Sequence, residues 1–434
     1  MQPLSIAVVG GGAAGLAAAY YLRRQGHRVE LIEKGACLGG RMTTATLGAR
    51  KIALGGKNIG RRYTLFREFV RDMGDQPFEY FGLNSSRIRD GRIVTLDGER
   101  RWAGMMRVLR TCTLRDVLRA APMVAAIRRD RRNAFLGGPF FTALEARREN
   151  DSPASYFSRS FCEQVVRPMS VRMNGAEPSQ IALGNFGTNL CMIFDTYEQL
   201  RDGFDPLFDR FAKTGPLRLG STVESLIVRQ GRVAGLRVRD ECGVEELAYD
   251  QVVLAMPARQ VEELLRPHSV ELAALLGAIK YFPVGVVVAE YDRPIFNRDV
   301  RALVFPEDQP LSNAGVYGLE ERHIVRYTFS GGMAQAMLQD EPRPERMLDE
   351  AERILARYVP VNRHERVSFV GKVMPIGLCA YTGGHARFAK GVESALRRLP
   401  GLELTGDYLQ GASIEACFRS SLACADRIRG AADA

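Results

Sequence analysis

A glycine-rich turn near the N-terminus is the first part of this sequence that could do chemistry. The run Gly10-Gly-Gly-Ala-Ala-Gly15 follows the β-branched, apolar segment 5–9 and precedes an alanine- and leucine-rich stretch that Gly26 ends. Glycine leaves the backbone bare, so such a turn can approach a pyrophosphate, and the N–H groups that open the next helix can bind its oxygens. The residues expected around the phosphates are Gly10, Gly12, Ala13, Ala14 and Gly15.

An acidic residue closes the next apolar run, which covers residues 27–33. Glu33 is placed to accept hydrogen bonds from the ribose of an adenosine, and its charge would repel a 2′-phosphate. A glycine turn alone is weak evidence, but here a predicted strand precedes it, a predicted helix follows it and an acid ends the second strand. The pattern therefore predicts a dinucleotide site that does not take NADP.

Two more glycine segments follow this acid. Gly39-Gly40-Arg41 comes first, and Ala53-Leu-Gly55-Gly56-Lys57-Asn58 comes second. Together with the N-terminal turn they resemble the flavin-containing amine oxidase superfamily, with its protoporphyrinogen oxidase and phytoene desaturase relatives. The resemblance implies that the first segment approaches the pyrophosphate and that the second passes along the flavin ring, although those relatives usually carry aspartate where this chain has Ala53. The cofactor residues implied here are Lys34, Gly40, Arg41, Gly56, Lys57 and Asn58.

The C-terminal end carries a matching segment. The run 402–407 predicts a strand that ends in a turn, and we expect a helix to open after Gly411 and to reach about Arg427. This pattern is similar to the C-terminal flavin motif of the family, which implies that Asp407 bonds the ribityl or pyrophosphate region. The helix N-terminus would then face the N1–C2=O edge of the flavin, where the reduced ring carries negative charge. The residues implied are Gly406, Asp407, Ser413 and Ile414.

The middle of the chain supplies a third match. Segments 221–228 and 233–238 predict a hairpin, and the resemblance implies that the backbone of Val223 meets the adenine. Motifs at both ends and in the middle therefore indicate one non-covalently bound FAD. Cys379 lies where some monoamine oxidases attach flavin covalently, and the other interpretation of this residue is a packed thiol.

The length of 434 residues suits two domains, and 46% apolar residues are enough for their cores. We expect an α/β fold in which a Rossmann-like FAD-binding domain is joined to a discontinuous α+β substrate domain. The first would comprise residues 1–75, 208–265 and 390–434, and the second residues 76–207 and 266–389.

The sequence says less about the substrate than about the cofactor. Flavin accepts hydride from a C–H bond next to nitrogen or from a C–C bond that becomes an alkene, and it needs no obligatory acid–base triad. Many amine oxidases carry a lysine in the strand that matches 284–289 and an aromatic pair that cages the amine. Here that strand has no lysine. Of the two positions that match the aromatic cage, one is Tyr381 and the other is Ser413, so only one is aromatic. The stretch 381–385 is closer to protoporphyrinogen oxidases, which act on large, flat substrates that carry carboxylates.

Three residues are candidates for the substrate site. Tyr381 belongs to the stretch just described, and His385 either shuttles a proton or has a structural role. Arg419, one helical turn beyond Glu415, either binds a substrate carboxylate or neutralises that glutamate. We predict an FAD-dependent oxidase or dehydrogenase for a small organic substrate, for which an anionic group is an option. A redox-neutral flavin-dependent isomerase or cyclase is the alternative, and a non-catalytic binding protein similar to GDP-dissociation inhibitors is a third interpretation.

Charge, cysteine spacing and the N-terminal residues argue against nucleic-acid-binding, zinc-binding and secreted classes of protein. The formal net charge of +10 comes mainly from arginine, yet no basic–aromatic module for RNA or DNA accompanies it. The eight cysteines and five histidines form no zinc pattern, so we expect no metal. The apolar stretch 6–22 is interrupted by glycines and lacks the charged start of a signal peptide. We therefore expect a cytoplasmic enzyme of undetermined oligomeric state, with peripheral contact to a membrane left open.

Residues 100–150 stand out for their arginine content. They enclose the apolar stretch 117–127, in which we expect Pro122 to interrupt any single helix. The segment is either a basic, partly apolar surface for an anionic substrate or an anionic membrane, or a solvated face of an arginine-rich protein. The arginines concerned are Arg100, Arg101, Arg107, Arg110, Arg115, Arg119, Arg128, Arg129, Arg131, Arg132, Arg147 and Arg148.

Overall fold

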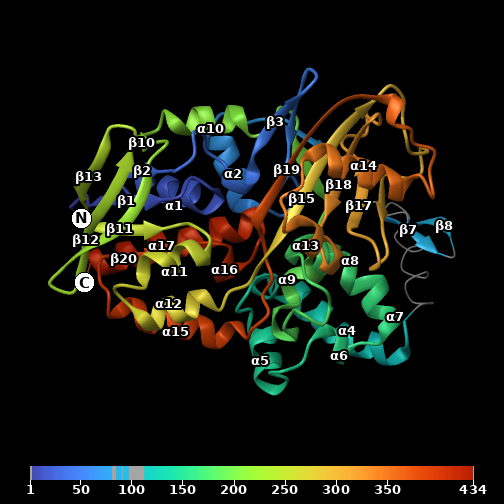
Figure 1. Cartoon of the computed structure of the whole chain (residues 1–434). Coiled ribbons are helices and arrows are strands. Elements are labelled where there is room, and N and C mark those ends of the chain that lie inside the picture. The colour runs from blue at the N-terminus through green and yellow to red at the C-terminus, as the bar shows by residue number, and fades with distance from the viewer. Residues whose placement is uncertain (1, 81–84, 90, 97–111, 434) are drawn as a thin grey trace.

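Two β-sheets on opposite sides of the molecule organise the fold, and a group of helices lies beneath the second of them (Figure 1). The computed structural model describes residues 2–80, 85–89, 91–96 and 112–433. Both chain ends lie on the same side of the molecule, next to the first sheet. Segments from the beginning, the middle and the end of the chain therefore build one layer.

The first sheet is parallel throughout. Its central strand is buried on both faces, as expected for a parallel sheet covered on both sides. Ile6 and Val8 pack against helices α1, α2 and α17, while Ala7 and Val9 pack against α11, α12, α15 and the hairpin strands β11 and β12. The strand order is β10 (Leu217–Arg218), β2 (Arg28–Ile32), β1 (Ser5–Val9), β14 (Gln251–Leu254) and β20 (Leu402–Leu404).

The elements that cover this sheet come from distant parts of the chain. The antiparallel strands of the adjoining three-stranded sheet are β11 (Thr222–Arg229), β12 (Arg232–Asp240) and β13 (Gly243–Ala248). The helices are α1 (Ala13–Arg24), α2 (Thr64–Asp72), α10 (Asp205–Ala212), α11 (Ala258–Leu265), α12 (Val270–Gly277), α15 (His385–Arg397), α16 (Asp407–Gln410) and α17 (Ile414–Asp433).

The second sheet has seven strands and is antiparallel apart from the pair β16 and β7. Val287, Ala289, Tyr327 and Phe329 on one face form a core with helices α13 (Gly332–Leu338) and α14 (Pro344–Leu355). Side chains alternate along a strand, so the neighbours of these residues point to the other face. The strand order is β19 (Arg366–Cys379), β15 (Tyr281–Tyr291), β18 (Ile324–Phe329), β17 (Leu311–Val316), β16 (Ala302–Val304), β7 (Ser85–Arg89) and β8 (Arg92–Leu96).

Short strands and a helical region complete the molecule. Strands β3 (Thr44–Leu47) and β4 (Arg50–Ala53) form a hairpin, and β9 (Tyr197–Leu200) pairs with β5 (Ile59–Gly60) and β6 (Phe78–Tyr80). The helical region has its own core, to which Met123, Phe141 and Phe186 belong. Its helices are α4 (Leu114–Arg129), α5 (Pro139–Arg147), α6 (Pro153–Tyr156), α7 (Arg159–Phe161), α8 (Arg167–Asn174) and α9 (Gly187–Leu190).

The α/β fold class predicted from the sequence is confirmed by this arrangement. The parallel sheet draws on the three segments assigned to the first domain, and the seven-stranded sheet draws on segments 85–96 and 281–379. The exact domain boundaries stay a prediction, as does the cytoplasmic location. Within the described part of the chain, no helix has both the length and the apolar character needed to cross a membrane.

The expectation that Pro122 interrupts the helix was wrong, because α4 continues through it from Leu114 to Arg129. A capping box between Thr113 and Asp116 fixes the start of the helix, and Met123 and Ile127 anchor it in the core. Pro122 lies on the exposed side, where water can bind the carbonyl oxygen that loses its helical partner. Arg100, Arg101, Arg107 and Arg110 of the arginine-rich segment lie outside the described residues.

One carboxylate joins the C-terminal helix to the N-terminal part of the chain. The side chain of Glu415 is buried on α17 and accepts hydrogen bonds from the N–H groups of Thr64, Leu65 and Phe66, which open α2, at 3.1–3.3 Å. These N–H groups have no partner within their own helix. A residue from the last helix therefore caps a helix that lies about 350 positions earlier in sequence.

We expect the substitution Glu415→Ala to lower the free energy of unfolding by about 2–4 kcal/mol, because it leaves several buried N–H groups without an acceptor. Chemical denaturation measures this value. The matched control is Glu393→Ala on α15, an exposed residue paired with Arg397, which should change the stability by less than about 0.5 kcal/mol. Equal effects of the two substitutions would contradict the capping role.

Candidate functional site

A large cavity of about 990 Å³ is bounded by both sheets. Its volume is at the upper end of the usual range for small-molecule sites, about 300–1,000 Å³. One part of the wall comes from the carboxyl ends of β1, β2 and β14, where ligands of open parallel sheets bind. The other part comes from β15, β17, β18, β19 and α8.

The first glycine turn has two kinds of glycine. A Cβ atom added to Gly12 would meet nothing within 4 Å, and the same holds for Gly56 in the third glycine segment, so both present bare backbone to the cavity. A Cβ atom on Gly15 would instead overlap the carbonyl oxygen of Gly10. Gly12 and Gly56 therefore leave room for a ligand, whereas Gly15 allows the turn to pack closely against its helix.

The second glycine segment lies directly on the first. The N–H of Gly39 donates a hydrogen bond of 2.8 Å to the carbonyl oxygen of Gly11. The carboxylate of Glu33 accepts the N–H of Gly11 at 2.5 Å and the N–H of Gly35 at 2.8 Å. These bonds hold Glu33 on the cavity wall beside the glycine turn, the position from which a carboxylate can bind a ribose.

An ion pair connects the two ends of the chain at this cavity. Arg41 Nη1 lies 2.7 Å from Asp407 Oδ2, and the hydroxyl of Tyr281 donates to Asp407 Oδ1 at 2.8 Å. Burial, followed by the neighbouring Asp407 carboxylate, holds the pKa of Tyr281 well above its usual value, so its hydroxyl keeps its proton. Arg41 also donates to the carbonyl oxygen of Gly377 on β19 at 3.1 Å. The second glycine segment, the C-terminal turn and the second sheet thus meet at one point.

The N-terminus of α17 forms the adjoining wall. Ser413 accepts the N–H of Ala416 through its hydroxyl oxygen at 3.1 Å and so caps the helix. Ser413, Ile414 and Cys417 all line the cavity. The positive end of the helix dipole therefore lies where it can stabilise negative charge on a bound ring.

The structure brings nearly all of the predicted cofactor residues together around this one cavity. Only Gly15 of that set does not line it. The bare backbone at Gly12 and Gly56, the oriented Glu33 carboxylate and the α17 N-terminus fit an elongated dinucleotide. The predicted residues that line the cavity are Gly10, Gly12, Ala13, Ala14, Glu33, Lys34, Gly40, Arg41, Gly56, Lys57, Asn58, Val223, Gly406, Asp407, Ser413 and Ile414.

The three residues predicted for the substrate site are not among the lining residues of the cavity. Tyr381 donates its hydroxyl proton to the backbone carbonyl of Asp407 at 2.8 Å. His385 is buried at the start of α15, and burial lowers its pKa to about 4, so the ring is neutral near pH 7. Arg419 Nη2 lies 3.2 Å from Glu415 Oε1, which agrees with the interpretation that Arg419 neutralises this glutamate. Its guanidinium also lies over the ring of Phe135.

Cys379 is fully buried and does not line the cavity. Its backbone carbonyl accepts a hydrogen bond from Asn174 at 2.9 Å, and burial holds the pKa of its thiol well above the usual value. A protonated, enclosed thiol is a poor nucleophile, so the surroundings of Cys379 are those of a packed thiol.

Sequence reasoning missed the polar residues on the second sheet. Across the strands, Val286 lies opposite Lys372 on β19 and Thr328 on β18, and Thr328 in turn lies opposite Asn313 on β17. All four line the cavity, as does Arg326 two residues before Thr328. The strand 284–289 carries no lysine, as the sequence indicated, but its neighbour supplies Lys372. No local motif marks these positions, because strand register alone brings them together.

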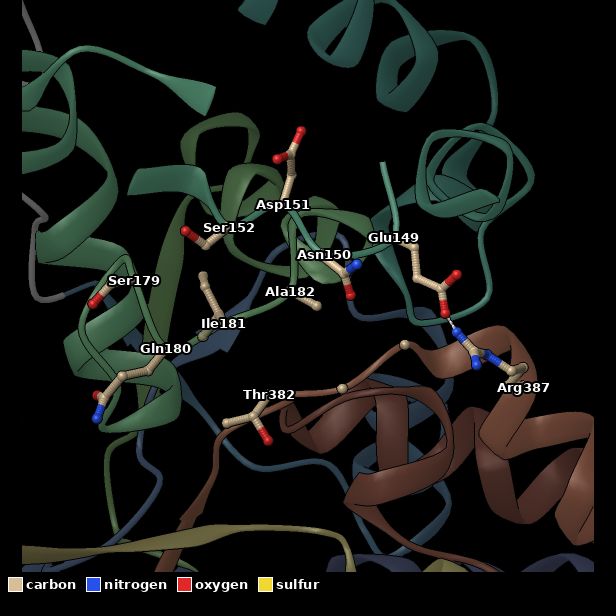
Figure 2. Close-up of a pocket in the computed structure, with 12 residues that line it drawn as sticks. Glu149, Asn150, Asp151, Ser152, Ser179, Gln180, Ile181, Ala182, Thr382 and Arg387 are labelled. Carbon is tan, nitrogen blue, oxygen red and sulfur yellow. Dashed lines mark ion pairs between the residues drawn. The ribbon is translucent and has the colours of Figure 1, made fainter. Parts of the chain in front are cut away.

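A second, smaller pocket of about 300 Å³ lies between the helical region and the loop that follows β19. Figure 2 shows Thr382 on one side and Asp151 on the other, with an ion pair between Glu149 and Arg387. The loop residues Thr382, Gly383 and Gly384 directly follow Tyr381, which reaches Asp407. Among the described residues, none lines both hollows, so the two are separate.

Comparisons with known proteins agree with this geometry. The family described as flavin containing amine oxidoreductase matches residues 13–429. The flavin-dependent L-tryptophan oxidase RebO of Lentzea aerocolonigenes is 27% identical over 68% of this chain and 67% of its own length. An L-amino acid oxidase of Crotalus durissus cumanensis is 34% identical over 85 residues, which are 20% of this chain and only 17% of that protein. The solved structure of cyclohexylamine oxidase from Brevibacterium oxydans superimposes with a TM-score of 0.73 at 17% identity over all of both chains, which at this identity shows a shared fold alone.

A pair of glycine substitutions separates ligand binding from packing. We expect Gly12→Ala to fold normally and to bind FAD at least about tenfold more weakly, because its new methyl group enters the space of the pyrophosphate. Gly15→Ala should instead destabilise the protein, because its methyl group overlaps the carbonyl oxygen of Gly10. Flavin absorbance after titration with FAD and a thermal unfolding scan measure the two effects. A Gly12→Ala protein with unchanged FAD affinity would contradict the assignment.

Proposed function

We propose that this chain, which belongs to the flavin-containing amine oxidoreductase family, oxidises a small organic substrate that carries an anionic group. As an FAD-dependent oxidoreductase it uses a cofactor that, when bound, accepts hydride at the flavin N5 atom. The bond that loses hydride would be C–N or C–C. Everything else that the reaction needs, namely binding, orientation and exclusion of water, is the task of the residues around the cavity.

The observation that carries the proposal is the distribution of charge along the cavity wall. The lining carboxylates, Glu33, Glu224, Glu263 and Asp407, belong to the elements around the parallel sheet. The lining residues of α8, β9 and the second sheet include several cations and, among the described residues, no carboxylate. The cations are Arg172, Arg326 and Lys372, and Arg301 directly before β16 also lines the cavity.

The cations on this wall are partly removed from water. Burial lowers the pKa of Arg326 to about 10, and burial also lowers the pKa of Arg172. Lys57 lies close enough for both arginines to act on it, and burial followed by Arg326 lowers its pKa well below the usual value. A group of like charges in a low-dielectric site is unfavourable without a counter-ion. A substrate carboxylate, held by charge-assisted hydrogen bonds, would supply one.

Arg172 is the best candidate to bind that carboxylate. Arg326 already donates to the backbone carbonyls of Ala53 at 2.5 Å and Gly55 at 2.9 Å, which fixes its direction. Arg172 on α8 makes no hydrogen bond or ion pair with any residue that the structure describes. Its guanidinium is therefore available to orient a substrate, while Met173 and Met192 on the same wall provide an apolar surface that excludes water.

The relatives support an amine that also carries a carboxylate. Two of those described above are named L-amino acid oxidase and L-tryptophan oxidase. An amino acid presents a C–N bond for oxidation and a carboxylate for recognition on adjacent atoms. In this interpretation Arg172 holds the carboxylate, and Lys372 Nζ, on the strand beside β15, is available to hold a water molecule.

An oxidase or dehydrogenase leaves its flavin reduced when oxygen is absent, whereas a redox-neutral isomerase or cyclase does not. We expect anaerobic mixing with the reactive member of a panel of L-amino acids to bleach the flavin absorbance lastingly, since hydride stays on the ring. The matched amines without the carboxylate, such as tryptamine for L-tryptophan, should bleach it far more slowly. Product formation without net bleaching would favour the isomerase or cyclase, and faster bleaching by the plain amine would contradict the anionic substrate.

Substitution of Arg172 tests the binding role directly. For the reactive carboxylated substrate, Arg172→Met should raise KM by about 10- to 100-fold with a smaller change in kcat, because it removes a charge-assisted bond. Arg172→Lys should recover part of that loss, because it restores the charge without the planar fork. The control Arg266→Met alters an exposed arginine directly after α11 that pairs with Glu262, and it should leave both constants unchanged. An unchanged KM in Arg172→Met, with flavin absorbance retained, would contradict the role.

A further inference from the structure

Helix α4 exposes an apolar stripe to solvent, and none of its residues lines either hollow. Leu114 is 75% exposed and Leu118 is 66% exposed, and the two are four residues apart on the same face. Ala121 and Pro122 continue the exposed side by another turn. The opposite side carries Met123 and Ile127, which are buried in the core of the helical region. The helix thus carries apolar side chains also on its exposed face, which a surface helix usually keeps polar.

Positive charge borders this stripe. Arg115 lies beside Leu114, and Arg128 and Arg129 end the helix, all three exposed and without an ion pair to any described residue. The one acidic residue of α4, Asp116, is buried in the capping box. The exposed surface of α4 therefore combines leucine side chains with uncompensated arginines.

The neighbouring segment extends the same surface. The guanidinium of Arg128 lies 5.4 Å from the centre of the Phe194 ring, and the preceding residue, Ile193, is 57% exposed. Figure 1 places α4 and α9, which leads to this segment, in the same helical region below the second sheet. The surface is defined here as the α4 face: Leu114, Arg115, Leu118, Arg128, Arg129 and Ile193.

The chemistry of the α4 face identifies its partner. A nucleic acid would pair with the arginines but would leave the leucines in water, so charge alone does not account for the stripe. An anionic lipid surface satisfies both features, because apolar side chains enter the boundary of the acyl chains while arginines pair with the headgroups. Pro122 does not prevent this arrangement, because α4 is already folded and held by its buried face.

We propose that the α4 face docks the protein on anionic membrane surfaces. The helix lies in the plane of the headgroups and does not cross the bilayer. Leu114 and Leu118 insert, and Arg115, Arg128 and Arg129 contact lipid phosphates or carboxylates. Burial of the leucines and attraction of the arginines to anionic lipids each contribute part of the membrane affinity, and neither alone gives stable binding. Docking of this kind is reversible and depends on ionic strength.

Co-sedimentation of the FAD-loaded enzyme with vesicles tests the proposal. Wild-type protein should sediment with vesicles of equal parts phosphatidylcholine and phosphatidylserine and stay in solution with phosphatidylcholine alone. Added salt should weaken the binding. The double substitution Leu114→Ser and Leu118→Ser should weaken it by at least about tenfold, and Arg128→Gln with Arg129→Gln should weaken it by roughly tenfold.

Matched controls change the same residue types elsewhere. Val270→Ser alters a residue on α12 that is 78% exposed, and Arg397→Gln alters an exposed arginine on α15, so both variants should bind like wild type. Flavin absorbance and turnover in solution should stay unchanged in every variant, because none of these residues lines the cavity. The arginine pair remains an independent test if the leucine pair lowers stability. Wild-type protein that stays in solution with anionic vesicles, or variants of the α4 face that sediment equally well, would overturn the proposal.

Discussion

The pairing of Arg41 with Asp407 is the interaction on which the rest of the site depends. It joins residues 366 positions apart and is completed by the hydroxyl of Tyr281, which comes from the second sheet. Because Arg41 belongs to a glycine segment that is hydrogen-bonded to the first glycine turn, the ion pair fixes the N-terminal phosphate region against the C-terminal turn. A cavity bounded by both sheets exists only when these three parts of the chain have come together.

Electrostatic asymmetry gives this cavity two functionally different regions. Carboxylates and a helix N-terminus lie around the parallel sheet, where a dinucleotide needs partners for ribose and phosphate. Cations dominate the wall formed by α8 and the second sheet, where burial makes an unpaired charge unfavourable. One region therefore suits the cofactor of the family, and the other carries the positive charge that the proposed anionic substrate would need.

Most of the residues predicted to bind the cofactor line one cavity, and the sequence could group them because many of their determinants are local. Gly12 and Glu33 are spaced by one strand–turn–helix–strand unit, and the resemblance to a known family added the C-terminal residues around Asp407. Arg172 and Lys372 could not be predicted in the same way, since their place on the wall follows from helix packing and strand register. Pro122 was misjudged for a related reason: propensity argues for a break, but a capped start and a buried face stabilise α4 across it.

A structure of the FAD-loaded protein tests most directly whether both ends of the chain hold one FAD molecule. The predicted result places the adenosine between Glu33 and Val223, the pyrophosphate over Gly12, and the flavin ring between the segment around Gly56 and the first turn of α17. A cofactor bound outside this cavity, or one that reaches Gly12 without approaching Asp407 and Ser413, would contradict it.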